Sequence, residues 1–433
     1  MVFSNLIFLY LFLPLCLAAY FLCRSVPAKN AVLIVFSLIF YAWGEPVYLF
    51  LMIAAAAVNW GFGLLIEKRH KRVFLVLALV LDLGCLAVFK YTGFVVENLN
   101  ALFGASIPVP VIALPIGISF YTFQALSYTV DVWRGDVPAQ RSFAKFLLYI
   151  SLFPQLIAGP IVRYSDIAPE LRSRTHTLSD AAAGTRRFVL GLAKKILFAN
   201  LLGELVSGFR ASQEQSVLYF WLGAAAFTLQ IYYDFSGYSD MAIGLGLILG
   251  FHFPENFRYP YCAGSITEFW RRWHISLGSW FRDYLYIPLG GSRCGKWRRY
   301  FNLMVTFLAS GLWHGASWGF VVWGGLHGLY QVIGYELRGM KDRINEKLHT
   351  KTDCLSYKLG QVLVTFCLTA FAWIFFRAGS LRDAFGYIRR MVTKPDPWCL
   401  FNGELYNLGL DRVEMNVLFV GLLILLLVDL VRY

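Results

Sequence analysis

The feature that most restricts the fold is a run of 36 residues without Asp, Glu, Lys or Arg, from Tyr300 to Tyr335. As a single α-helix this run would extend about 54 Å, at about 1.5 Å per residue. The hydrocarbon layer of a bilayer is only about 30 Å thick. The run therefore predicts two spanning helices, near 300–318 and 319–336, with the chain doubling back between them. Five glycines supply flexible points for that bend: Gly311, Gly315, Gly319, Gly324 and Gly325.

Shorter charge-free runs recur along the rest of the chain. The sequence is 58% hydrophobic and only 15% charged, whereas soluble domains contain about 25% charged residues. Backbone groups have no water partners in lipid, so a span must be a helix or part of a closed barrel. Runs such as LFLMIAAAAV do not alternate apolar and polar residues, as barrel strands would. We therefore expect an all-α, polytopic integral membrane protein. The predicted spans are 3–23, 30–43, 47–66, 73–90, 111–130, 145–162, 187–207, 216–234, 238–252, 300–318, 319–336, 358–376 and 413–431.

Helix-breaking residues interrupt two of these spans. Pro115 and Gly117 lie in the fifth span. Pro154, Gly159 and Pro160 lie in the sixth. Broken helices are tolerated at membrane depth only where the free backbone groups meet protein or a water-filled cavity. The breaks thus predict an interior cavity, with ordinary helix kinks as the alternative.

The net charge of +13 does not indicate nucleic-acid binding. The basic residues cluster in short segments between apolar runs, at 67–72, 271–299 and 337–352. This is the pattern of cytoplasmic loops. Segment 91–110 holds one Glu and no Lys or Arg, so we expect it on the opposite side. The eight cysteines include no CxxC pair, and we predict neither a disulfide framework nor a metal site.

Segment Thr267–Arg299 is too polar to face lipid all round, and it predicts an amphipathic helix at the cytoplasmic interface or dipping into the protein. On such a helix, His274 would share a stripe with apolar side chains. The segment is densely cationic. This charge suits either a polyphosphate-bearing cofactor or the attraction of anionic lipid. The candidate cofactor-binding residues are Arg271, Arg272, Arg282 and Arg293.

His314 is the first candidate for a catalytic residue. It lies deep in the uncharged run, and a titratable group at membrane depth is costly enough to indicate a function. Near neutral pH an imidazole can accept a proton from a hydroxyl and return it to a leaving group. We expect Gly311, Gly315 and Gly319 to leave room for a substrate beside it. The alternative is a hydrogen-bonded core histidine.

Two other histidines need separate interpretations. His274 could face a cavity or the lipid headgroups. His327 follows His314 by thirteen residues, which on one continuous helix places it about 20 Å away on another face. It therefore has a structural role unless the chain turns between the two. In the polar string QIYYDFSGYSDMAIG, we expect Asp240 to meet an arginine of the basic segment.

Several strings together resemble the membrane-bound O-acyltransferase superfamily, and in particular its bacterial alginate O-acetylase-like branch. They occur in family order from near residue 1 to about residue 378, and the match is weaker from Gly379. The most specific are RRWHISL with SWFRDYLYIPLGG, followed by LWHG. The other matching strings are MVFSNLIFLYLFLP, LPIGISFYTFQALSYTVDVWRG, FPQLIAGPIVR, QIYYDFSGYSDMAIGLGLILGF, NFRYPY and AWIFFRA.

The resemblance implies one domain over 1–433, with about eleven or more helices around a funnel and a thin septum at the active site. One or two C-terminal helices of longer relatives would be missing. The motif histidines are implied to be His274 and His314, with His314 the principal catalytic one. The implied location is the bacterial plasma membrane, in contact with its lipids.

The implied reaction is transfer of an acyl group from a cytoplasmic donor, acetyl-CoA in this branch, toward hydroxyls of an extracellular polysaccharide or cell-wall glycan. A secreted or membrane-anchored transferase with an esterase fold is the implied partner. A related branch instead moves D-alanine from a carrier protein toward teichoic acid. A transporter could also use broken helices, but transporters often contain internal repeats, and none is evident in the sequence.

Overall fold

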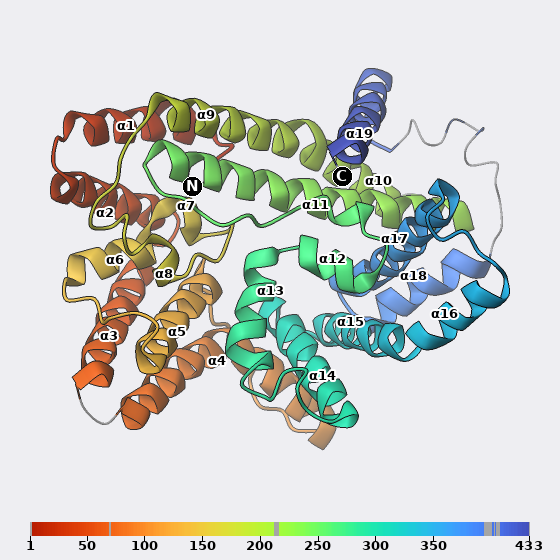
Figure 1. Cartoon of the computed structure of the whole chain (residues 1–433), viewed down its shortest axis with the longest axis horizontal. Coiled ribbons are helices and arrows are strands. Elements are labelled where there is room, and N and C mark those ends of the chain that lie inside the picture. Colours follow the sequence, from red (N-terminus) through yellow and green to blue (C-terminus); the bar gives the residue numbers. More distant parts are fainter. Residues whose placement is uncertain are drawn as a thin grey trace. The chain divides into compact units, whose positions relative to one another are not determined.

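The computed structural model describes residues 2–68, 71–211, 216–393, 401, 403 and 408–432 (Figure 1). Within these ranges the chain is helical with no β-strand, which confirms the all-α prediction. The chain divides into two compact units. Unit 1 comprises Met1–Leu192 and Tyr238–Glu255, and unit 2 comprises Ala193–Gly237 and Asn256–Tyr433. A single domain over 1–433 remains a prediction.

The first nine helices begin within unit 1, and the remaining ten begin within unit 2. The first nine are α1 (Leu13–Leu22), α2 (Val26–Ala42), α3 (Tyr48–Lys68), α4 (Lys71–Phe103), α5 (Ile118–Arg134), α6 (Phe143–Ser151), α7 (Phe153–Leu156), α8 (Tyr164–Ile167) and α9 (Leu178–Ala193). The others are α10 (Leu201–Ala211), α11 (Val217–Ile248), α12 (Ile266–Arg272), α13 (Ile275–Phe281), α14 (Lys296–His314), α15 (Trp318–Glu336), α16 (Arg338–Lys347), α17 (Leu355–Arg377), α18 (Leu381–Thr393) and α19 (Arg412–Arg432). Phe8–Phe12, Lys194–Asn200 and Arg282–Tyr286 form π-helical segments.

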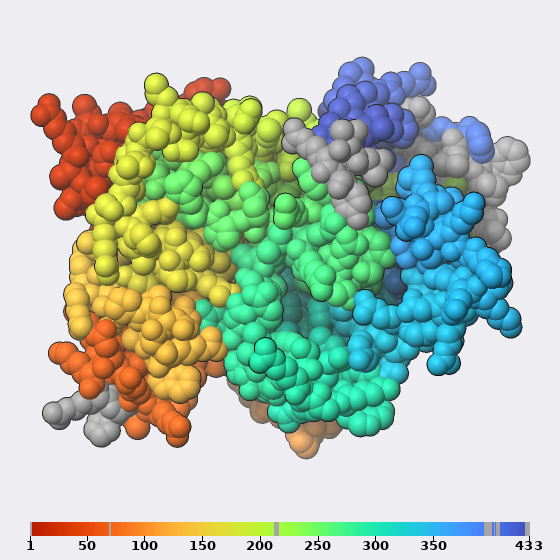
Figure 2. All heavy atoms as spheres, in the orientation of Figure 1, coloured from red at the N-terminus to blue at the C-terminus, as the bar shows by residue number. Residues whose placement is uncertain are grey.

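Three described helices, α3, α4 and α17, are long and apolar enough to cross a bilayer. On α4, the side chains of Val73, Val76 and Val80 are more than half exposed. Such apolar exposure suits contact with lipid rather than with water. The total number of spans remains a prediction. By contrast, the basic segment 337–352 contains α16, whose charged side chains are exposed. This part of the chain lies at the surface of the molecule (Figure 2).

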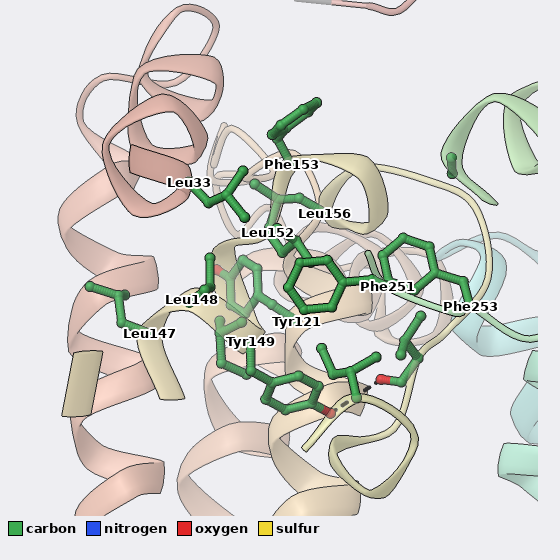
Figure 3. Close-up of a cluster of buried hydrophobic side chains, with 14 of the residues drawn as sticks. Leu33, Tyr121, Leu147, Leu148, Tyr149, Leu152, Phe153, Leu156, Phe251 and Phe253 are labelled. Atoms are coloured by element: carbon green, nitrogen blue, oxygen red, sulfur yellow. Dashed lines mark hydrogen bonds between the residues drawn. The ribbon is translucent and has the colours of Figure 1, made fainter. Parts of the chain in front are cut away.

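The predicted breaks in 111–130 and 145–162 are present in unit 1. Gly117 has φ +78° and precedes α5, and a Cβ there would lie 2.7 Å from the carbonyl oxygen of Leu156. Span 145–162 divides at Leu152 into α6 and α7. The freed backbone N–H of Phe153 donates to Ser37 Oγ at 3.1 Å. The break is thus compensated by protein, within the core that packs Leu152 and Phe153 against neighbouring apolar side chains (Figure 3).

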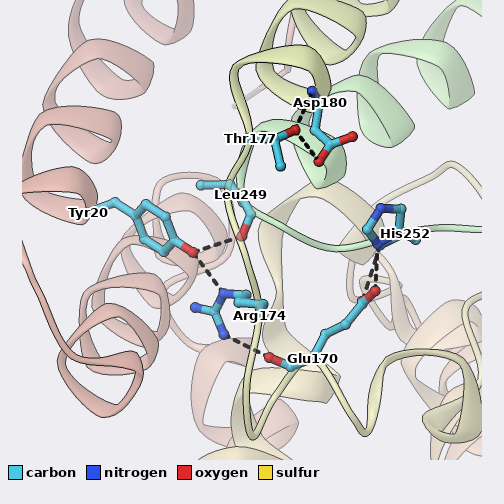
Figure 4. A network of polar contacts seen from close by, with 7 residues as sticks. All are labelled: Tyr20, Glu170, Arg174, Thr177, Asp180, Leu249 and His252. Carbon is cyan, nitrogen blue, oxygen red and sulfur yellow. Dashed lines mark hydrogen bonds and ion pairs between the residues drawn. The ribbon is translucent and has the colours of Figure 1, made fainter.

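A polar network fixes the segment that leads into α9 (Figure 4). Arg174 Nε donates to the hydroxyl of Tyr20 at 2.7 Å, and that hydroxyl donates to the carbonyl of Leu249 at 2.7 Å. Glu170 pairs with His252 at 2.7 Å. These contacts join α1, the loop before α9 and the end of α11 within unit 1.

The expected separate spans 216–234 and 238–252 are wrong, because α11 continues from Val217 to Ile248. Its acidic side chains are neutralised by basic partners, so the helix needs no break to accommodate them. Asp234 pairs with Lys195 at 2.5 Å in unit 2. Asp240 pairs with Arg187 of α9 at 3.0 Å in unit 1, which corrects the expected partner from the basic segment.

Candidate active site

The run 300–335 doubles back, as its length predicts. Helix α14 ends at His314, and α15 begins at Trp318. Gly315 lies in the turn between the two helices, but two of the other glycines have a different role from the one expected. A Cβ on Gly311 would lie 2.3 Å from the carbonyl oxygen of Phe320, and one on Gly324 would lie 2.3 Å from that of Phe307. The two helices therefore touch backbone to backbone, and Gly311 and Gly324 create this contact rather than a bend.

The open end of this hairpin is held by charged side chains. Lys296 at the start of α14 forms an ion pair with Glu336 at the end of α15, at 2.5 Å. The guanidinium of Arg299 lies 3.4 Å from the centre of the Tyr335 ring. A cation over an aromatic face is attracted by the ring quadrupole. Both ends of the hairpin are thus defined, and the turn presents His314.

The half-buried imidazole of His314 is surrounded by aromatic rings from three helices. Ring centres lie at 4.9 Å for Trp313 of α14, 5.1 Å for Trp323 of α15 and 5.1 Å for Phe376 of α17. These rings shield the imidazole from bulk water on several sides and fix its orientation.

The glycines beside His314 do not leave room for a substrate, and that expectation is wrong. The space beside Gly315 is occupied by the Phe320 ring, 2.2 Å from where a Cβ would stand. The space beside Gly319 is occupied by the carbonyl oxygen of Phe375, at 2.5 Å. Glycine is required at these two positions because other parts of the protein pack against them and leave no space for a side chain.

His274 occupies a corner, and the predicted continuous helix 267–299 is wrong. Helix α12 ends at Arg272, α13 starts at Ile275, and His274 has left-handed backbone angles of φ 43° and ψ 55°. A non-glycine residue in this region is strained and needs support from its surroundings. The break removes the expected stripe and turns His274 inward, where only 1% of its surface is exposed.

Asn256 and Ser276 hold the ring of His274. The Oδ1 atom of Asn256 lies 3.0 Å from His274 Nδ1 and accepts a hydrogen bond from Ser276 Oγ at 2.8 Å. A carbonyl oxygen can only accept, so Nδ1 carries the proton in this pair. In the neutral ring Nε2 then has a lone pair, and this buried atom has no hydrogen-bond partner within the described residues. A basic nitrogen is thereby left available.

One indole connects the two motif histidines. The centre of the Trp313 ring lies 6.1 Å from that of His274 and 4.9 Å from that of His314. Both histidines belong to unit 2. The structure thus brings together the two residues expected to be catalytic, in one aromatic cluster.

His327 lies near the same cluster because the chain turns. The centre of its ring lies 5.0 Å from that of Trp323, which also contacts the ring of His314. However, His327 Nδ1 accepts a hydrogen bond from Trp270 Nε1 at 3.2 Å. The proton of the neutral ring is then on Nε2, and the side chain is fully buried. His327 therefore lacks the free lone pair that His274 has, which supports a structural role.

The four candidate arginines have different surroundings. Arg272 pairs with Glu268 at 2.6 Å, and Arg282 forms a two-point contact with Asp283, with Nε at 2.7 Å from Oδ1. The hydrogen bond to Asp283 raises the pKa of Arg282. The other two candidates, Arg271 and Arg293, are exposed. Their role in holding a donor remains a prediction. The described residues contain no cluster of His, Cys, Asp and Glu able to hold a metal ion.

Sequence reasoning did not single out Asn256 or Ser276. Asn256 is the first residue of the NFRYPY string and Ser276 lies within the RRWHISL string, so membership of these motifs was the available signal. Their convergence on His274 depends on the αL corner, which amphipathic periodicity could not indicate.

An aromatic-walled pair of histidines on an all-helical membrane scaffold fits an acyl-transfer enzyme. Residues 134–378, more than half of the chain, match the sequence model of the membrane-bound O-acyltransferase family. The chain belongs to this family and is a membrane-bound O-acyltransferase.

Similar proteins refine this class. The chain is 41% identical over 435 residues to a probable alginate O-acetylase of Pseudomonas aeruginosa, covering 98% of this chain and 81% of the relative. It is 34% identical to a peptidoglycan O-acetyltransferase of Helicobacter pylori, and this match covers 90% of this chain and 80% of the relative. A teichoic acid D-alanyltransferase of Bacillus subtilis is 24% identical, and the match covers 60% of this chain and 68% of the relative.

Proposed function

We propose that this chain transfers acetyl groups from cytoplasmic acetyl-CoA toward hydroxyls of an extracellular polysaccharide or cell-wall glycan, in the bacterial plasma membrane. The similarity to proteins named alginate O-acetylase and peptidoglycan O-acetyltransferase extends over most of the chain. The similarity to D-alanyltransferases is lower and covers less of it. These comparisons favour acetyl over D-alanyl transfer. A partner transferase with an esterase fold is part of the proposal.

The observation that carries the proposal is the meeting of His314 and His274 around Trp313. In the proposed step, the hydroxyl oxygen of the acceptor attacks the thioester carbonyl, and His314 takes the hydroxyl proton. The carbon–sulfur bond then breaks, and the thiolate leaves with a proton returned by the imidazole, so that an ester and free CoA result. General base catalysis of this kind contributes typically about 10²–10⁴-fold.

His274 is proposed as the supporting histidine. It is almost completely buried, whereas His314 is half-buried and better placed to meet a substrate. The oriented lone pair on His274 Nε2 can accept a hydrogen bond from a protonated neighbour or from the acceptor hydroxyl. Its role is then to stabilise charge that develops as the proton moves.

The proposal is tested by incubating the purified protein, with its membrane glycan fraction, with acetyl-CoA labelled in the acetyl group. We expect label in alkali-labile esters and release of free CoA, and we expect His314→Ala to abolish both while expression and donor binding persist. His274→Ala should impair transfer, and the matched variant His327→Ala should impair it less. Retained transfer in His314→Ala together with its loss in His327→Ala would contradict the assignment.

Two further arms distinguish the alternatives. D-alanyl groups presented on a carrier protein should not replace acetyl-CoA as the donor. A transporter would move a solute across sealed vesicles without cleaving the thioester, so consumption of acetyl-CoA separates an enzyme from that class.

A further inference from the structure

Unit 2 contains a cavity away from the histidines, among α10, α11, α17 and α18. It encloses about 500 Å³ of empty space, part of it open to solvent. The walls are mainly apolar and include Val206, Phe209 and Ile374. The charged residues on the lining are Arg210, Arg377 and Asp383. The cavity thus combines an apolar body with a charged end.

The charged end has a surplus of positive charge. Arg377 is stacked on the ring of Phe227, with its guanidinium carbon 4.8 Å from the ring centre. Its Nε is buried and has no hydrogen-bond partner among the described residues. The positive charge of Arg210 acts on it unfavourably. Burying an unpaired guanidinium costs free energy, and an anion between the two arginines would offset that cost.

The acidic residue of the lining does not provide this anion. Asp383 is exposed in the first turn of α18, where Ser380 Oγ accepts a hydrogen bond from its backbone N–H at 3.1 Å. Among the described residues, its carboxylate forms no ion pair with Arg210 or Arg377. Arg390, on the same helix as Asp383, is a further cation nearby. Its guanidinium carbon lies 5.6 Å from the centre of the Phe220 ring.

The position of the cavity on α17 indicates where an anion would come from. Helix α17 is apolar and long enough to cross a bilayer, and Leu359, Leu363 and Val364 on it are exposed. Arg377 is its last residue. Long basic side chains at the end of a spanning helix reach the level of the lipid headgroups. Basic pockets between such helices suit anionic lipid headgroups.

We propose that this cavity binds one anionic phospholipid, with the phosphodiester between Arg210 and Arg377 and the start of an acyl chain along Val206, Phe209 and Ile374. The inference does not depend on the proposed reaction. It has a structural link to it, because Phe376, next to Arg377, forms part of the wall around His314. An occupied cavity would therefore fix the end of α17 that carries this wall.

The test uses the full-length protein, purified and delipidated in detergent, with lipid binding measured by native mass spectrometry. We expect dioleoylphosphatidylglycerol to bind about tenfold or more tightly than dioleoylphosphatidylcholine. The two lipids have the same chains and the same phosphodiester, but the choline ammonium of the second is repelled by the two arginines and offsets the charge of its phosphate. Equal binding of the two lipids by the wild-type protein would refute the proposal without any variant.

Variants then locate the site. Arg377→Gln should remove the preference for phosphatidylglycerol, while Arg389→Gln, on the exposed face of α18 and outside the lining, should preserve it. The reverse result would assign binding to general surface charge and contradict the proposal. Asp383→Asn removes a negative charge from the lining at an exposed position, so it should strengthen lipid binding without disturbing the core. Weaker binding by this variant would count against the site.

A final arm separates a lipid from a free anion. Inorganic phosphate at millimolar concentration should not displace the lipid, because it gains nothing from the apolar walls. Full displacement would show that the two arginines bind a soluble anion instead, and the lipid assignment would be wrong.

Discussion

The two buried histidines of unit 2 illustrate how one hydrogen bond defines the chemistry of an imidazole. Asn256 accepts from Nδ1 of His274 and leaves a lone pair on Nε2, whereas Trp270 donates to Nδ1 of His327 and leaves a proton on Nε2. The sequence singled out the motif histidines His274 and His314 and gave His327 a structural role, but it could not identify these partners. The partners lie 18 and 57 residues away along the chain.

Asn256→Ala should therefore lower the rate of acetyl transfer about tenfold or more. General acid–base catalysis contributes typically about 10²–10⁴-fold in rate, and we expect this variant to lose part of that contribution. The side chain that fixes the tautomer of His274 is lost, while His314 is untouched. Asn256→Asp keeps an acceptor oxygen and should restore much of the rate, with a shifted pH–rate profile. Rates and melting temperatures of both variants provide the check.

A merely structural role would lower the melting temperature of both Asn256 variants without changing the pH–rate profile of the remaining activity. Ser276→Ala is the matched control. It removes the hydrogen bond from the Ser276 hydroxyl to the same oxygen but leaves the contact to His274, and we expect a smaller loss.

Arg282→Gln tests the predicted donor site. If Arg282 contacts a phosphate of acetyl-CoA, its loss should raise KM for acetyl-CoA by about tenfold, at the lower end of the range for a charge-assisted contact, because the side chain is 62% exposed. Arg343→Gln on exposed α16 should leave KM unchanged. Normal donor binding by Arg282→Gln would instead favour attraction of anionic lipid by this segment.

At the scale of the helices, the length of the apolar runs predicted the hairpin of α14 and α15, but the sequence did not predict where other helices continue or break. The 36-residue run had to fold back because it is too long for one crossing, and it does. Helix α11 was predicted as two spans, 216–234 and 238–252, yet it continues through Asp234 and Asp240, which pair with Lys195 and Arg187, distant in sequence. Conversely, segment 267–299 was predicted as one helix, because periodicity does not reveal that the backbone N–H of Ile275, at the corner, donates to the carbonyl of Asn256.

The contact between α14 and α15 makes a prediction of its own. Gly311→Ala should push the helices apart, because a Cβ would lie 2.3 Å from a carbonyl oxygen. Overpacking of this kind costs about 1–3 kcal/mol, and it would displace His314, three residues away. We expect a lower melting temperature and strongly reduced acetyl transfer.

Gly325→Ala is the matched control in the same hairpin. Its new methyl group would meet only Leu308 Cδ2, at 3.7 Å, which is an ordinary contact. Since Ala favours a helix over Gly by about 1 kcal/mol, this variant should be as stable as the wild type or more so. Equal effects of the two substitutions would mean that the backbone contact has no special importance.

At the scale of the whole molecule, the distribution of basic residues predicts an orientation in the membrane. In a background without the native cysteines, of which Cys354 is exposed, Lys71→Cys should resist an impermeant maleimide added to intact cells. Ser106→Cys, in the segment expected on the opposite side, should react. Labelling at Lys71→Cys in intact cells, with Ser106→Cys protected, would reverse the proposed orientation.

The backbone contact along the seam of α14 and α15 also limits how the enzyme can admit its substrates. At this seam the backbone carbonyl groups lie where side chains would otherwise pack. A small separation of the two helices would leave a gap, because no flexible side chain is present to fill it. The hairpin must then behave as one rigid body during turnover. Movement beside His314 therefore falls to the α12–α13 corner, which meets the hairpin through the rings of His274 and Trp313. Helix α17 contacts the hairpin through a carbonyl as well, that of Phe375 at Gly319.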